Sequence, residues 1–257
     1  MNGAVKIGIG QFCLIYLLLL VVLFVMKKSE VNKTKLVLWA SLRMTVQLVV
    51  AGIILTYLFK NAHPVFTVLF LVLMMAFSIH RVLSTQKKLN WKFKIAVSAS
   101  LGICGLLVLI YFVCAVVGEN FFNPQYTIPL AGMIIGNSMT GITLGLKSFT
   151  EGLHSQRAKI NTLINLGVTP KAILKPIVNN ALETAMMPTL NSMLGMGIIF
   201  LPGMMTGQIL SGTPPTTAIL YQIAIMIAIC AGVCLSVFCS LNLGYRTLYN
   251  DRNQILL

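Results

Sequence analysis

Three polar side chains and a methionine, with the spacing of a helix face, lie in the sixth apolar block of the chain. The series consists of Asn180, Glu183, Met187 and Asn191. Intervals of three or four residues place side chains on one side of a helix, and such a stripe in a membrane helix normally faces a bundle interior or a water path. Carboxylate and amide oxygens bind hard cations, whereas the thioether of Met187 suits softer ones. The pattern predicts a substrate path that Glu183, Met187 and Asn191 line, with Glu183 and Met187 as candidate metal ligands.

A second ionisable residue lies inside the second apolar block. Arg43 is followed one helical turn later by Gln47. An ionisable side chain inside a membrane span costs roughly 2.5–3.5 kcal/mol, so we assign Arg43 and Gln47 to the substrate path as a hypothesis. Two structural alternatives stay open. The Arg43 side chain extends to the cytoplasmic headgroups, or it neutralises Glu183.

An uncharged run rich in glycine and methionine, Leu201–Gly212, follows the sixth block. Irregular backbone at membrane depth is tolerated only where it is buried in protein or lines a cavity. The run therefore predicts either a re-entrant gate at the outer mouth of the path or a simple outer loop. The candidate gate residues are Pro202, Gly203, Met204, Met205 and Gln208.

The longest hydrophilic stretch runs from Glu151 to Lys175 and has one apolar helical face, made of Leu153, Ile160, Leu163, Ile164 and Leu166. Gly167 is expected to end that helix, and Pro170 suits the first turn of the next. A short cytoplasmic helix, a glycine turn and a second helix resemble the coupling helix that ABC permeases present to their ATPase. The alternative is an interfacial helix on anionic lipid, which the basic residues also favour. The predicted docking residues are Arg157, Lys159, Asn161, Leu166, Gly167 and Pro170.

The elements that position these residues follow from composition. The chain of 257 residues is 57% hydrophobic and 9% charged, far below the roughly 25% charged residues of soluble domains. Its apolar residues form long blocks, which indicates membrane helices. We expect an all-α integral membrane protein with about seven transmembrane helices, forming a single polytopic domain over residues 1–257 with a cytoplasmic coupling loop at 147–176. The expected spans are Gly8–Met26, Leu36–Phe59, Pro64–Ile79, Ile95–Val117, Tyr126–Leu146, Ile177–Leu201 and Thr217–Leu243.

The basic residues of the chain, whose net charge is +14, cluster in short loops beside apolar blocks. This pattern sets membrane topology and argues against nucleic-acid binding. Lys6 and Lys60 lie on one predicted side and Arg43 lies in a span, while sixteen of the nineteen basic residues fall on the other side. The asymmetry predicts a multi-pass protein of the cell (inner) membrane, in contact with lipid, with its N-terminus outside and its C-terminus cytoplasmic. The sixteen are Lys27, Lys28, Lys33, Lys35, Arg81, Lys87, Lys88, Lys92, Lys94, Lys147, Arg157, Lys159, Lys171, Lys175, Arg246 and Arg252.

No phosphate-binding loop of the form G-x-x-x-x-G-K-[ST] occurs in the sequence. We therefore expect no ATP hydrolysis, no enzymatic activity and no cofactor in this chain, with Mg-ATP bound by a partner subunit. The six cysteines all lie inside apolar blocks, and no loop pairs them at metal or disulfide spacing. Packing is their expected role, as it is for Asn137, Ser138 and Thr140 in the fifth block.

Four blocks, in order along nearly the whole chain, are similar to the FetB-type family of iron-export ABC permeases, whose plant relatives are linked to aluminium tolerance. They are Arg43–Leu48, Gly132–Met139, Leu166–Pro170, and Leu201–Gly212 followed by Tyr221 and Gln222. The resemblance implies the permease subunit of a metal exporter that works as a homodimer with a separate ATPase. Asn161-Thr-Leu163 departs from the Glu-Ala-Ala of many permease loops. The rivals are an ion-coupled carrier or channel centred on Glu183, and a membrane scaffold that transports nothing.

Overall fold

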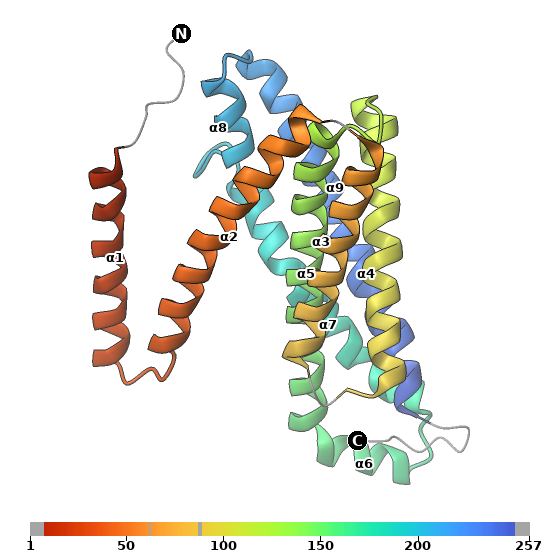
Figure 1. Ribbon diagram of the computed structural model, residues 1–257. Helices are drawn as coiled ribbons and strands as arrows, with labels where there is room; N and C mark the ends of the chain where they lie inside the picture. The colour runs from red at the N-terminus through yellow and green to blue at the C-terminus, as the bar shows by residue number, and fades with distance from the viewer. Residues whose placement is uncertain (1–7, 62, 87–88, 250–257) are drawn as a thin grey trace. The chain divides into compact units, whose positions relative to one another are not determined.

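The computed structural model of the chain describes residues 8–61, 63–86 and 89–249, and this part is helical apart from turns and one isolated bridge between Met196 and Phe200 (Figure 1). Among the basic residues counted above, Lys6, Lys87, Lys88 and Arg252 lie outside the described residues, as does the side chain of Cys13. The helices are α1 (Ile9–Lys28), α2 (Thr34–Lys60), α3 (Pro64–Thr85), α4 (Trp91–Tyr111) with the π-turn η1 (Phe112–Val117), α5 (Pro124–Ser155), α6 (Arg157–Asn165), α7 (Pro170–Gly195), α8 (Gly203–Leu210), α9 (Pro215–Tyr245) and the 3₁₀ turn η2 (Arg246–Leu248).

Six helices of the described chain are long and apolar enough to cross a membrane, namely α1, α2, α3, α4 with η1, α5 and α9. Helix α7 has 26 residues, which is long enough, but its asparagines and Glu183 make it less apolar than the others. The prediction of an all-α membrane protein with about seven helices is confirmed. Helix α3 continues to Thr85, six residues beyond the predicted end of the short third span.

The chain forms two compact units. The smaller contains residues 1–61 and 207–213, and the larger contains residues 62–206 and 214–257. Within the smaller unit, α1 and α2 are joined by a short turn, and the Tyr16 Oη and Thr45 Oγ1 atoms form a 2.7 Å hydrogen bond between them. Most side chains of these two helices are exposed and apolar. That residues 1–257 act as one membrane domain stays a prediction.

Helix α5 lies at the centre of the larger unit and contacts α3, α4, α7 and α9. Two of its glycines permit close approach, as their i, i+4 spacing predicts. A Cβ placed on Gly141 would lie 2.7 Å from Val233 Cγ1, and one on Gly145 would lie 3.2 Å from Val237 Cγ1. By contrast, no atom lies within 4 Å of a Cβ on Gly136. The close packing of α5 with α7 and α9 therefore depends on Gly141 and Gly145.

Gly141→Ala is expected to lower the free energy of unfolding by about 1–3 kcal/mol, because Val233 or the α5 backbone must move. Gly136→Ala is the matched control. It adds the same methyl group to the same helix without a clash, and alanine is favoured over glycine in a helix by roughly 0.5–1 kcal/mol. The measurement is the melting temperature of the purified variants in detergent. Equal melting temperatures would contradict the packing described for Gly141.

The basic connections of the larger unit lie at one end. Figure 1 shows that α3 ends, α4 begins and α9 ends at the same end of this unit as α6. Described basic residues in these segments are Arg81, Lys92, Lys94, Arg157, Lys159 and Arg246. Within this unit the arrangement agrees with the charge asymmetry of the sequence.

Candidate functional site

Helix α7 has a buried apolar face and an exposed polar face. Ala181, Ala185 and Thr189 are buried against the bundle. The predicted path residues Glu183, Met187 and Asn191 lie together on the exposed side, as does Asn180. The hydrophobic face of this helix therefore supplies packing energy, while its polar groups point away from the core of the chain.

Helix α5 adds a second row of polar side chains that the sequence analysis did not include in the path. Asn137, Thr140, Lys147 and Glu151 are exposed and Ser148 is half-buried. Asn137 and Thr140 lie three positions apart, Thr140 and Lys147 seven, and Ser148 and Glu151 three, so they return to one side of the helix, and this spacing is the signal by which they could have been found. The helix extends past the predicted span to Ser155 because Phe149 and Leu153 are buried in the core.

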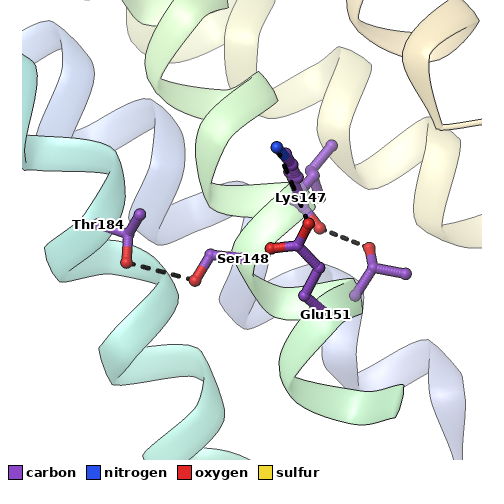
Figure 2. Close-up of polar contacts among 6 residues, drawn as sticks. Lys147, Ser148, Glu151 and Thr184 are labelled. Atoms are coloured by element: carbon purple, nitrogen blue, oxygen red, sulfur yellow. Dashed lines mark hydrogen bonds and ion pairs between the residues drawn. The ribbon is translucent and has the colours of Figure 1, made fainter. Parts of the chain in front are cut away.

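Contacts join the two rows into one surface (Figure 2). The Ser148 hydroxyl donates to Thr184 Oγ1 across α5 and α7 at 3.3 Å, and the Thr184 hydroxyl donates to the Asn180 carbonyl at 2.8 Å. On the same turn of α5 as Ser148, the Lys147 Nζ and Glu151 Oε1 atoms are 3.8 Å apart. We call this surface the α5–α7 polar face. Its members are Asn137, Thr140, Lys147, Ser148, Glu151, Asn180, Glu183, Thr184, Met187 and Asn191.

The electrostatics of the polar face favour a cation. Lys147 and Glu151 offset each other, whereas Glu183 has no hydrogen-bond or ion-pair partner among the described residues. Pro188 lies inside α7 and has no N–H, so it cannot donate to the Thr184 carbonyl one turn earlier. The Thr184 carbonyl, next in sequence to Glu183, therefore lacks the usual donor from the following turn of the helix.

The other predicted path residues belong to the smaller unit. Arg43 and Gln47 are exposed on α2, one turn apart. Since the polar face belongs to the larger unit, their membership of the same path stays a prediction, and so does an ion pair between Arg43 and Glu183.

The segment predicted as a gate or an outer loop contains a short helix. Helix α7 ends at Gly195 rather than Leu201, and residues Gly203–Leu210 form helix α8. The Pro202 carbonyl accepts the backbone N–H of Thr206 at 3.0 Å, which begins this helix. Met204 is half-buried and Met205 is buried. Gln208 lies on the part of α8 that belongs to the smaller unit, so its role in a gate stays a prediction.

The predicted docking segment forms a short helix, a turn and a new helix. Ile160 is buried, and Leu163 and Ile164 are half-buried, which confirms the apolar face of α6. The prediction that Leu166 shares this face is wrong, since its side chain is 73% exposed. Leu166 follows the last residue of α6, so the helical spacing no longer applies to it. Residues 147–155, predicted as loop, belong to α5.

The turn after α6 is a Schellman motif, which exposes apolar side chains. Gly167 has φ of +80°, its N–H donates to the Ile164 carbonyl at 2.9 Å, and the Val168 N–H donates to the Leu163 carbonyl at 3.0 Å. Pro170 occupies the start of α7, as predicted. Arg157, Lys159 and Asn161 are exposed on α6. An exposed leucine at the end of this helix suits a protein contact.

Gly167→Val is expected to destabilise this turn by about 1–2 kcal/mol, because a residue with a Cβ is strained at positive φ. Gly167→Asn is the matched control, since asparagine tolerates the left-handed conformation. Amide hydrogen exchange of residues 157–169 is the measurement, and the valine variant should exchange faster than the asparagine variant. Identical exchange in both would show that the turn does not depend on a left-handed residue.

These features define a multi-pass helical membrane protein with a polar face on two neighbouring helices. The chain belongs to the uncharacterised protein family UPF0014, whose model matches residues 9–249. It is 32% identical to the UPF0014 membrane protein YjkA of Bacillus subtilis (strain 168), over 92% of this chain and 93% of that protein. It is 30% identical to the "Probable iron export permease protein FetB" of Escherichia coli (strain K12), over 96% of this chain and 94% of that protein.

A plant relative matches a shorter region. The chain is 39% identical to the Protein ALUMINUM SENSITIVE 3 of Arabidopsis thaliana over 105 residues, which is 41% of this chain and 38% of that protein. The resemblance to FetB-type proteins is confirmed. No solved structure matches the chain.

Proposed function

We propose that this chain is the permease subunit of an ABC transporter that exports iron or another metal, and that two copies act with a separate ATPase that binds Mg-ATP. The observation that carries the proposal is the α6 turn, which holds Leu166 exposed at the end of a helix on which Arg157 and Lys159 are also exposed. The similarity to a protein named as an iron export permease supports it. The charge asymmetry supports a further part of the proposal, in which this turn and the C-terminus lie on the cytoplasmic side and the N-terminus lies outside.

The connections of α6 suggest how ATPase movement reaches the path. One residue separates α5 from α6, and four residues separate α6 from α7. A push on the turn is therefore passed to the two helices that form the polar face. Pro176 and Pro188 each remove a backbone hydrogen bond within α7, so this helix bends more readily than its neighbours.

The polar face also supports a pair of permeases. Polar groups at membrane depth are costly against lipid and normally face protein or water. A second copy that places its own α5 and α7 opposite this face would enclose a polar path between the subunits. Glu183 and Asn191 would line that path, and the lone carboxylate of Glu183 would attract a metal cation.

A second candidate function is an ion-coupled carrier. The observation that favours it is the absence, among the described residues, of a partner for the Glu183 carboxylate. Such a group can take up a proton or an ion without any ATPase.

Purification of the tagged chain from its native membranes in mild detergent separates the two functions. Mass spectrometry should identify a Walker-motif ATPase that co-purifies with the chain and not with an unrelated tagged multi-span protein. If no such ATPase is recovered, the docking argument fails and the carrier centred on Glu183 becomes the leading function.

A further inference from the structure

Two adjoining cavities in the larger unit are rich in methionine. The first, of about 230 Å³, lies between α5, α7, α9 and the segment after α7. The second, of about 490 Å³, lies between α9 and the same segment. They share Met196, Pro202, Gln222 and Met226 in their walls. Six of the fourteen methionines of the chain line the two cavities, namely Met133, Met193, Met196, Met204, Met205 and Met226.

A buried amide without a full set of partners faces these cavities. The Gln222 side chain lines both and is only 7% exposed. Its Nε2 atom donates to Met196 Sδ at 3.7 Å, while its Oε1 atom is buried and has no hydrogen-bond partner among the described residues. Leaving a buried acceptor unpaired costs free energy, so this oxygen requires an explanation.

Two further polar side chains around the smaller cavity, Asn137 and Ser192, direct their donors toward the backbone. The Asn137 Nδ2 atom donates to the Met133 carbonyl at 2.7 Å, and the Ser192 hydroxyl donates to the Pro188 carbonyl at 2.9 Å. The groups that remain are thioether sulfurs, oxygen lone pairs and the Thr189 hydroxyl, and all of them can act as Lewis bases. No residue described in either wall is ionisable. A neutral wall of electron-pair donors suits a cation better than an anion.

We call the two adjoining cavities together the methionine cavity. We propose that it binds a soft monovalent cation of the Cu⁺ or Ag⁺ type at the wall that the two cavities share, with Met196 and Met226 as thioether ligands and Gln222 Oε1 as an oxygen ligand. Thioethers select soft ions, whereas Mg²⁺ and other hard cations require oxygen ligands. A single positive charge also fits a site that has no carboxylate to offset a higher charge.

The smaller cavity and the polar face share one residue. Asn137 is exposed on α5 as part of that face, and it also lines the smaller cavity. A cation drawn to Glu183 would therefore reach the methionine cavity along the same surface. Binding at the cavity does not depend on the proposed function, but transport of the bound ion as cargo does rest on it.

The test is a titration of the purified chain in detergent with Ag⁺, which is a redox-inert soft probe. Because thiols also bind Ag⁺, the six cysteines are first replaced by alanine. The double variant Met196→Leu, Met226→Leu keeps the volume of both side chains nearly constant. It is expected to weaken Ag⁺ binding at least about tenfold, because loss of a metal ligand or its support has an effect of this size. Gln222→Leu should also weaken binding.

Met75→Leu combined with Met139→Leu is the matched control, since both methionines pack against the core and line neither cavity. It should bind Ag⁺ like its parent. If the cysteine-free chain does not fold, the number of Ag⁺ ions bound is compared between the cysteine-containing parent and the Met196/Met226 double variant, which should bind fewer. Equal Ag⁺ binding by the double variant and the parent would overturn the proposal, and so would equal weakening by the control pair.

Discussion

Leu166→Asp is expected to reduce recovery of the ATPase with the tagged chain by about 30-fold, which corresponds to the roughly 2 kcal/mol of an interface hot spot. Leu166 is 73% exposed beside the Schellman turn, so the substitution removes an apolar contact and places a carboxylate in the interface. Because the side chain lies outside the core, the fold should be unchanged. The measurement is the ratio of ATPase to permease after affinity purification.

Val31→Asp is the matched control for this prediction. Val31 is also an exposed apolar residue in a connection between helices, 42% exposed in the turn between α1 and α2. The control should retain the ATPase. Equal recovery with Leu166→Asp would show that the α6 turn is not the docking surface.

Glu183→Gln is expected to lower cation transport about tenfold or more. Two unit charges about 4 Å apart interact by roughly 4 kcal/mol at an effective dielectric constant near 20. Loss of even a third of this energy lowers the occupancy of the bound cation about tenfold. The glutamine keeps the size of the side chain, and Glu183 has no partner among the residues described, so folding should be preserved. Transport is measured in vesicles at matched protein content.

Two further variants test whether the effect on transport depends on the negative charge at position 183. Glu183→Asp keeps the charge and should retain part of the transport. Glu30→Gln removes an exposed carboxylate from the turn between α1 and α2 and should transport like the parent. Unchanged transport in Glu183→Gln would show that no carboxylate is required at this position.

Local rules of sequence predicted much of the fold. Long apolar blocks mark the membrane helices because twenty or so apolar residues are needed to cross the hydrocarbon core. Gly167 and Pro170 mark the end of α6 and the start of α7, since each residue type has a strong backbone preference. The i, i+4 glycine pairs Gly132/Gly136 and Gly141/Gly145 predict close packing, which the structure shows at Gly141 and Gly145 but not at Gly132 and Gly136.

Tertiary contacts determine the parts of the structure that the local sequence rules did not predict. Lys147 and Glu151 suggested a loop, but Phe149 and Leu153 hold this segment in the core as part of α5. The glycine-rich run suggested irregular backbone, as a re-entrant gate or an outer loop, whereas Gly203–Leu210 form helix α8. The methionine cavity could not be predicted, because its walls combine α5, α7 and α9 with the segment that follows α7.

Reconstitution into vesicles tests the central claim most directly. The chain is incorporated alone or with its co-purified ATPase, and cation movement is followed after addition of Mg-ATP or after a proton gradient is imposed. If the chain is an ABC permease, movement requires both the second polypeptide and ATP, and a proton gradient alone drives none. Cation movement by the chain alone under a proton gradient, without dependence on ATP, would contradict the claim and identify an ion-coupled carrier.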